Sequence, residues 1–220
     1  MLKGIIFDVD GTLLDSMEIW QDVGVRYLEK QGVKPEPGLS EILFPLGIEE
    51  GAVYLKEHYH LEQSVDQMIA GVLDTVRDFY YNEVQLKPGV TDYLASLYQK
   101  GISMVVATSS ERELVEAAFR RLNITNYIEK IFTCSEVGAG KNRPVIYQKA
   151  SEYLEAGPEE ICVFEDVLHA LETAKRAGFH TVGVYDRFSA DDNEKIQETA
   201  ELYLEDMTEV DRFWKYASGI

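Results

Sequence analysis

Two aspartates, Asp8 and Asp10, follow the apolar run Gly4–Phe7 and come directly before Gly11. A buried strand rarely ends in two carboxylates, because charge at the edge of a core is costly unless it is paired or bound to a metal. Residues two apart in an extended segment point to the same face. Two like charges on one face therefore indicate a bound cation at the end of a strand. The competing interpretation is an ordinary Asp-Gly surface turn.

Two later apolar runs also have the character of short buried strands that end in polar residues. The run 102–108 ends in Thr108 and is followed by Ser109. The run 161–165 ends in Glu165 and is followed by Asp166. In an open parallel sheet, ligands bind at the carboxyl ends of the strands. We therefore expect these side chains to gather with the first two aspartates.

Alternation of strands and helices predicts the fold class. Strands are expected at 4–7, 102–108, 130–134, 161–165, 180–185 and 201–204, and helices at about 90–100, 111–122, 144–156 and 168–177. This order is typical of an α/β fold with a Rossmann-like parallel sheet flanked by helices. Lys141 lies in a glycine-rich loop between the third strand and the next helix.

The segment between the first and second strands is helical in pattern. Apolar residues recur at helical spacing at about 48–59 and 63–84, and no convincing strand is found between 16 and 86. We therefore expect residues 1–15 and 87–220 to form the α/β core domain and residues 16–86 to form a small helical domain. The hinges should lie near Leu14–Ser16 and Gln85–Pro88.

Composition narrows the possible partners and the compartment. The net charge of −18 over 220 residues argues against nucleic acid and against anionic membranes, because both repel an acidic surface. Cys134 and Cys162 are expected to be buried free thiols, which fits a reducing cytosol. No signal peptide and no run of membrane-spanning length is found, so a cytoplasmic location is expected. The oligomeric state is left open.

Four motifs in order resemble the haloacid dehalogenase superfamily of phosphotransferases. They are Asp8-Val-Asp10-Gly11-Thr12, Thr108-Ser109-Ser110, Lys141 and Glu165-Asp166. The resemblance covers nearly the whole chain and includes a helical cap inserted directly after the first motif, the family's cap type one. It implies a phosphatase, a HAD-like phosphoric monoester hydrolase, that acts on a small phosphorylated molecule.

The resemblance implies two catalytic residues, and their chemistry is consistent with phosphoryl transfer. Asp8 would be the nucleophile, because a carboxylate can take up phosphate as an acyl phosphate and so divide one difficult step into two. Asp10 would protonate the leaving alkoxide and then deprotonate the attacking water.

The resemblance also implies a magnesium ion and a phosphate site. Magnesium prefers hard oxygen ligands, and the implied set is Asp8, the Asp10 carbonyl and Asp166, with Glu165 near the ion. Thr108, Ser109 and the following backbone N–H groups would bind phosphate oxygens at a helix start. Lys141 would reduce the repulsion between the nucleophile and a phosphate dianion.

Each signal has a plainer interpretation when it stands alone. Thr108 could be a helix N-cap and Lys141 a solvated surface lysine. Glu165-Asp166 could merely cap the next helix. His58 and His60 are interpreted as surface residues, because no third metal ligand is in view.

Two other functions remain as alternatives to a phosphatase. One is a sugar-phosphate mutase similar to beta-phosphoglucomutase, and the other, less favoured, is a non-catalytic phosphate-binding module. Mutases of this kind carry a histidine after the first motif and a cap arginine, whereas Trp20 stands at the first place and the loop 43–50 contains no arginine. A hydrophobic or amphipathic organic phosphate is therefore favoured over a sugar bisphosphate. Departures from the family pattern lie at Val167, Ala170 and Asn142-Arg143.

Overall fold

The computed structural model describes all 220 residues, Met1–Ile220. The chain divides into two compact units. Met1–Asp15 and Gln85–Ile220 form the first, here called the sheet unit, and Ser16–Val84 form the second, here called the inserted unit.

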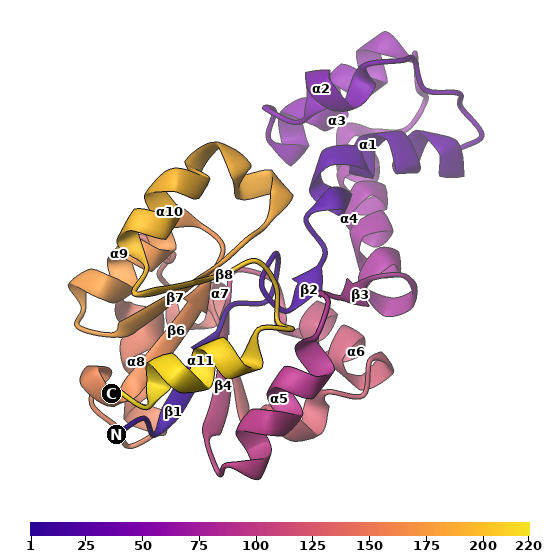
Figure 1. Cartoon of the computed structure of the whole chain (residues 1–220). Helices are drawn as coiled ribbons and strands as arrows, with labels where there is room; N and C mark the ends of the chain where they lie inside the picture. The colour runs from indigo at the N-terminus through magenta and orange to yellow at the C-terminus, as the bar shows by residue number, and fades with distance from the viewer. The chain divides into compact units, whose positions relative to one another are not determined.

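The sheet unit is built on six parallel strands in the order β5-β4-β1-β6-β7-β8 (Figure 1). The strands are β1 (Gly4–Phe7), β4 (Ser103–Thr108), β5 (Lys130–Thr133), β6 (Ile161–Glu165), β7 (His180–Val184) and β8 (Leu202–Leu204). The predicted Rossmann-like α/β fold is confirmed. All six expected strands are present within one or two residues of their predicted bounds.

Helices connect and cover these strands. They are α5 (Val90–Gln99), α6 (Arg112–Arg121), α7 (Cys134–Val137), α8 (Val145–Tyr153), α9 (Leu168–Arg176), α10 (Asn193–Thr199) and α11 (Val210–Ala217), with 3-10 turns at Thr125–Tyr127, Pro158–Glu160 and Arg187–Asp192. Figure 1 shows α5 and α11 in front of the sheet and α8 behind it. The sheet is therefore covered on both faces, as its continuous apolar strands require.

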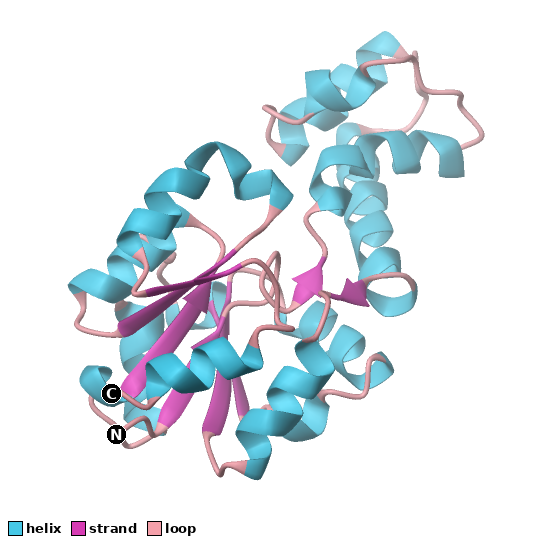
Figure 2. Cartoon of the chain, in the orientation of Figure 1, coloured by secondary structure: helices cyan, strands magenta, loops and turns pink.

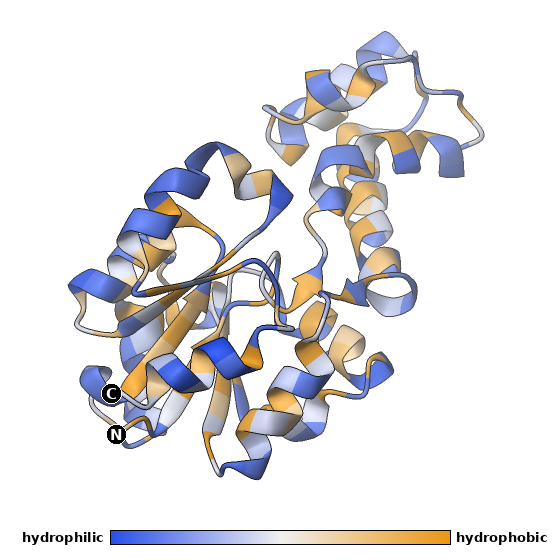
Figure 3. Ribbon diagram, in the orientation of Figure 1, coloured by the Kyte–Doolittle hydropathy of each residue, from blue (hydrophilic) through white to orange (hydrophobic).

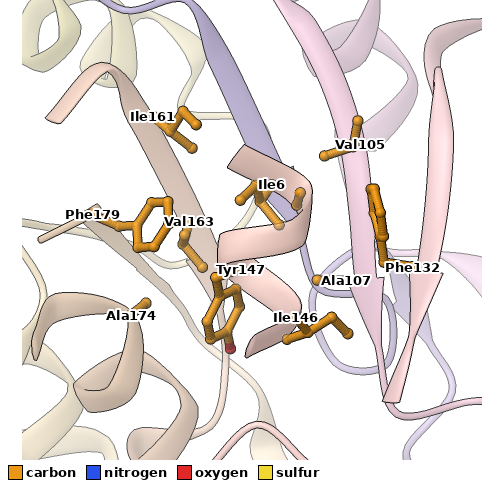
Figure 4. Close-up of a cluster of buried hydrophobic side chains, with 11 residues drawn as sticks. Ile6, Val105, Ala107, Phe132, Ile146, Tyr147, Ile161, Val163, Ala174 and Phe179 are labelled. Carbon is orange, nitrogen blue, oxygen red and sulfur yellow. The ribbon is translucent and has the colours of Figure 1, made fainter. Parts of the chain in front are cut away.

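Both faces of the sheet are packed with apolar side chains. One face carries a buried cluster to which β1, β4, β6, α8 and α9 contribute (Figure 4). On the other face, the ring of Phe164 packs against those of Tyr93 and Phe213, which come from α5 and α11. Figure 3 shows the central strands as mostly hydrophobic, whereas the helices alternate between hydrophobic and hydrophilic residues. Burial on both sides holds the strand ends at fixed positions.

The inserted unit consists of helices (Figure 2). They are α1 (Glu18–Lys30), α2 (Leu39–Leu43), α3 (Ile48–His58) and α4 (Val65–Asn82). Their apolar faces share a core of seven buried residues that includes Tyr27, Leu55 and Met68. Ser64 and Gln67 form a reciprocal capping box that fixes the start of α4.

Some elements were not predicted from the sequence. The short strands β2 (Leu14–Asp15) and β3 (Gln85–Leu86) pair antiparallel. Neither was predicted, and β3 lies within the segment 16–86, where no strand was expected. Two-residue strands carry no periodicity that a pattern could detect. No helix of the structure has both the length and the apolar composition needed to cross a bilayer. Cys134 and Cys162 are both free, but only Cys162 is fully buried.

Candidate active site

The candidate site forms where β1 lies between β4 and β6. On one side of β1 lie β4 and β5, and on the other side lie β6, β7 and β8. The loops that leave the carboxyl ends of β1, β4 and β6 therefore diverge. Such a switch point is where open α/β sheets bind ligands. The polar residues predicted to end these strands are Asp8, Thr108 and Glu165, and all three are buried.

A tight turn follows β1. The backbone N–H groups of Thr12, Leu13 and Leu14 all donate to the carbonyl of Val9. Gly11 has a φ of +85°, and a Cβ placed there would lie 2.4 Å from Asp166 Oδ2. Only glycine fits this position, because it tolerates positive φ and leaves room for the carboxylate.

Three carboxylates form a buried cluster at the strand ends. Oxygen atoms of Asp8, Glu165 and Asp166 lie within 4.8 Å of one another. These three residues are at most 6% exposed. Oxygen donors of this kind suit a hard divalent cation. The Asp10 carboxylate is not part of this cluster, so the structure brings together three of the four predicted metal residues by their side chains.

Lys141 lies among these carboxylates. It is 7% exposed, and its Nζ donates to Asp8 Oδ1 and, at 2.7 Å, to Glu165 Oε1. Gly138, with a φ of +69°, ends the short helix α7 three residues before the lysine. The interpretation of Lys141 as a solvated surface lysine is therefore wrong.

Burial and charge oppose each other within the cluster. Burial, followed by the neighbouring carboxylates, raises the pKa of Asp8 well above its usual value, although Lys141 lowers it. Burial and the charge of Glu165 raise the pKa of Asp166 to about 7. Burial alone would lower the pKa of Lys141, but the charges of Asp8 and Glu165 have the larger combined effect and raise it. The ammonium group therefore stays protonated. One lysine facing three acids leaves a local excess of negative charge that a cation can neutralise.

Two hydroxyl groups position Asp166. Thr12 Oγ1 donates to Asp166 Oδ1 and Ser189 Oγ donates to Oδ2, both at 3.3 Å. Thr12 belongs to the first motif, whereas Ser189 comes from the turn Arg187–Asp192 after β7 and carried no sequence signal. The N-cap of α9 is Val167 and makes no side-chain cap bond. The interpretation of Glu165-Asp166 as a mere cap of that helix is therefore wrong.

Asp10 is turned toward the loop after β4. Ser110 Oγ donates to Asp10 Oδ2 at 2.5 Å across 100 residues of sequence. Thr108 Oγ1 accepts from the Ser110 N–H at 3.0 Å, which folds this loop into a tight turn before α6. The exposed Ser109 lies beside it, with its Oγ 3.5 Å from Cys134 Sγ. A carboxylate oriented by a hydroxyl group can give or take a proton, and the exposed Ser109 lies in the neighbouring turn.

Tyr147 is a site residue that sequence reasoning missed. It is fully buried in α8, and its hydroxyl donates to Glu165 Oε1 at 2.7 Å. In Figure 4 its oxygen points away from the other labelled side chains of the cluster. The only sequence signal would have been a tyrosine at an otherwise apolar helix position, since a buried hydroxyl needs a partner. His58 and His60 lie in the inserted unit, outside the acidic cluster.

Comparisons with known proteins give one family. Residues 5–184 match the family model described as haloacid dehalogenase-like hydrolase. A phosphorylated carbohydrates phosphatase of Thermotoga maritima is 29% identical over 182 residues, which is 82% of this chain and 84% of that protein. A validoxylamine A 7'-phosphate phosphatase of Streptomyces hygroscopicus subsp. limoneus is 28% identical over 212 residues, 96% of each chain.

Solved structures show the same fold. A crystal structure from Thermotoga maritima, provisionally named a beta-phosphoglucomutase, superposes with a TM-score of 0.84 at 24% identity and covers 97% of this chain and 99% of that one. CbbY from Rhodobacter sphaeroides in complex with phosphate gives a TM-score of 0.69 at 23% identity, with 96% of each chain covered. At these identities the likeness establishes the fold alone.

Proposed function

Since the chain belongs to the haloacid dehalogenase-like hydrolase family, we propose that it is a magnesium-dependent phosphatase that hydrolyses a small organic phosphate monoester through an aspartyl-phosphate on Asp8. The observation that carries the proposal is the buried group of Asp8, Glu165 and Asp166 around Lys141. A structural core gains nothing from such a cluster, because buried like charges raise one another's cost.

Asp8 is the proposed nucleophile. One of its oxygens attacks phosphorus, the bond from phosphorus to the ester oxygen breaks, and the phosphoryl group is carried on the carboxylate. Lys141 touches the same carboxylate and offsets repulsion between it and the incoming dianion. Water then attacks the acyl phosphate, which releases inorganic phosphate and restores Asp8.

Asp10 is the proposed acid and base. It gives a proton to the leaving ester oxygen in the first step and takes one from the attacking water in the second. Ser110 fixes the orientation of this carboxyl group through its bond to Oδ2. Thr108, Ser109 and the N–H groups of their turn are proposed to bind the phosphate oxygens.

Magnesium fits the donor set of the cluster. Asp8 and Asp166 would be side-chain ligands, the Asp10 carbonyl a further one, and Glu165 would lie near the ion. A bound divalent cation supplies positive charge that stabilises the developing charge on the phosphoryl oxygens. Thr12 and Ser189 hold Asp166 in place for this role.

The substrate class is proposed from the relatives and from the inserted unit. The two sequence relatives are named for phosphorylated carbohydrates and for validoxylamine A 7'-phosphate. The inserted unit, proposed as a substrate-selecting cap, exposes the apolar residues Ile42, Phe44 and Ile48 and offers no arginine in the loop 43–50. These features favour a monophosphate with an apolar or amphipathic portion over a bisphosphate.

The test compares wild type with Asp8→Asn on p-nitrophenyl phosphate, with magnesium and with a chelator. We expect hydrolysis only in the wild-type protein with magnesium, and a phosphoryl label on the peptide that contains Asp8. The conservative substitution Asp15→Asn, at an exposed position in the same segment, is the control and should retain activity. Full activity of Asp8→Asn, or turnover without metal, would contradict the mechanism.

A screen of phosphorylated metabolites then distinguishes the alternatives. A mutase interconverts sugar phosphates in the presence of a bisphosphate activator and releases little inorganic phosphate. A non-catalytic module binds phosphorylated ligands without turnover. Release of inorganic phosphate from a monophosphate is the outcome that the proposal requires.

A further inference from the structure

Lys87 is a buried lysine that the proposed chemistry does not use. It is 8% exposed, and apart from Lys141 it is the only buried lysine of the chain. It is the first residue after β3. Lysines are almost never buried unless they are paired, because the ammonium group loses its hydration. Its partners therefore indicate what the charge is for.

All three donors of the Lys87 ammonium are occupied. Nζ donates to the carbonyl of Gly11 at 2.7 Å, to the carbonyl of Tyr185 at 2.5 Å and to Asp186 Oδ2 at 2.9 Å. An ammonium group has three donors and no acceptor, so its bonding is complete. One side chain thus joins the turn after β1 to the end of β7.

The bond to Gly11 bears directly on the candidate site. Gly11 lies between Asp10 and Thr12, and its Cα approaches Asp166 so closely that a Cβ would overlap the carboxylate. The backbone of Lys87 is also held there, because its N–H donates to the carbonyl of Leu13 at 3.0 Å. A displacement of the Gly11 carbonyl would therefore move the peptide groups beside the acidic cluster.

The bond to Asp186 leads to the same carboxylate by a second route. Asp186 Oδ1 accepts from the N–H of Phe188 at 2.9 Å and so begins the turn Arg187–Asp192. Ser189, in this turn, donates to Asp166 Oδ2. The ion pair is buried, with the Lys87 and Asp186 side chains 9% and 3% exposed. Asp186 is therefore fixed between the lysine and the segment that holds Asp166.

We propose that Lys87 is a positioning residue for the proposed phosphatase. It fixes the turn at Gly11 directly, and it fixes the segment that contains Ser189 through Asp186. These two segments contact Asp166 from two sides and so hold its carboxylate in place beside Asp8. This inference rests on the proposed function. Besides Lys141, Lys87 is the second buried lysine of the chain, and it reaches the acidic cluster from the side of the β1 turn.

The experiment uses Lys87→Met, Asp186→Asn and the double variant in the full chain. Lys87→Met leaves a buried carboxylate without its cation, which destabilises the protein whatever the role of the lysine. Asp186→Asn removes that charge and retains an oxygen that can accept from Phe188. The double variant therefore separates charge compensation from positioning. Lys56→Met is the matched control, because Lys56 also donates to two backbone carbonyls but lies in the inserted unit.

The readouts are kcat and KM on p-nitrophenyl phosphate, calorimetric magnesium titration, thermal unfolding and amide hydrogen exchange of residues 8–14. We expect the double variant to unfold closer to wild type than Lys87→Met does. Its kcat and magnesium affinity should nevertheless stay about 10- to 100-fold lower, as is usual when a partner behind a ligand is removed. The 8–14 amides should exchange faster, and Lys56→Met should behave like wild type.

Recovery of kcat and magnesium affinity together with stability in the double variant would overturn the proposal, because Lys87 would then serve only to balance charge. If Lys87→Met alone does not fold, the double variant carries the same comparison. Failure of the proposed function has a different signature. Wild type would then hydrolyse no phosphate ester, whereas exchange of the 8–14 amides would still report whether Lys87 holds the turn.

Discussion

The Tyr147 hydroxyl and the Lys141 ammonium donate to the same atom, Glu165 Oε1, each at 2.7 Å. Both donors are buried, and Lys141 also touches Asp8. Burial and the charge of Glu165 raise the pKa of Tyr147, so the phenol remains a donor. The tyrosine therefore fixes the carboxylate that, in turn, fixes the lysine beside the proposed nucleophile.

Tyr147→Phe should destabilise the protein and slow catalysis. Loss of a hydrogen bond to a charged group costs about 2 kcal/mol, and the misplaced Lys141 should lower kcat by about tenfold. Tyr93→Phe is the matched control, because Tyr93 is equally buried but its hydroxyl has no hydrogen-bond partner. Denaturant unfolding and steady-state kinetics measure both effects. Equal behaviour of the two variants would remove Tyr147 from the site.

Gly11→Ala should abolish magnesium binding and turnover, since the added methyl group would collide with Asp166 Oδ2. Gly101→Ala is the control for the backbone conformation alone: Gly101 has a φ of +73° and no atom within 4 Å of the added Cβ. Gly101→Ala should therefore show only conformational strain of about 1 kcal/mol and full activity. Calorimetric magnesium titration and kinetics of both variants test this. Normal magnesium affinity in Gly11→Ala would contradict the close approach.

Ser110→Ala should affect substrates according to their leaving group. If Ser110 orients Asp10 as the proton donor, its loss slows the hydrolysis of alkyl phosphates, which need a proton on the leaving oxygen. p-Nitrophenyl phosphate should be slowed much less, because its phenolate leaves without protonation. The ratio of the two kcat/KM values should change by about tenfold.

Ser109→Ala provides the comparison for this experiment. Ser109 is proposed to contact the phosphate, which both substrates share, so its removal should lower both kcat/KM values by the same factor. A Ser110→Ala variant that also slows both substrates equally would show that the serine does not act through proton transfer.

The metal-free protein should lose stability as the pH rises from about 5 to 8. Folded Asp166, with its pKa raised to about 7, holds its proton to a higher pH than an unfolded aspartate with a pKa of about 3.9. The folded state therefore binds more protons in this window, and the free energy of unfolding falls as the pH rises. Burial raises the pKa of Asp8 in the same direction.

Thermal unfolding in chelator and in excess magnesium measures this dependence. Magnesium favours the ionised carboxylates, so the loss of stability with pH should be much smaller when it is present. Asp166→Asn should make the chelator curve less steep, because it removes one of the two groups with a raised pKa. A chelator curve that rises between pH 5 and 8 would contradict the assigned direction.

Several features of the site follow from the sequence alone. Apolar runs ending in Asp8, Thr108 and Glu165-Asp166 place these residues at carboxyl strand ends, because a buried strand and its terminating polar residue are both local patterns. The alternation of strands with helices predicted a parallel sheet, and in a parallel sheet the carboxyl ends of the strands lie at one edge. The role of Lys141 was implied by the resemblance to the haloacid dehalogenase superfamily, and its burial did not follow from any local pattern.

The sequence patterns did not predict the shortest elements, and one helix that has a helical pattern was also not predicted. Strands β2 and β3 have two residues each, and α2 has five, which is too short for a period to emerge. The helix α11 was also not predicted, although Val210, Phe213 and Ala217 recur at helical spacing. Phe213 of that helix packs on the sheet against Phe164 and Tyr93.

The order of the strands in the sheet, which no local pattern encodes, decided the remaining contacts. Ser110 reaches Asp10 across 100 residues, and Lys87 reaches Asp186 across 99. No local pattern encodes such pairs, because the direction of a side chain in space depends on how its element packs against the others. The sequence by itself determined which strand ends carry acid. Only the tertiary structure decided which hydroxyl and ammonium groups hold those acids in place, since hydrogen bonds of this length require atoms brought together from distant segments.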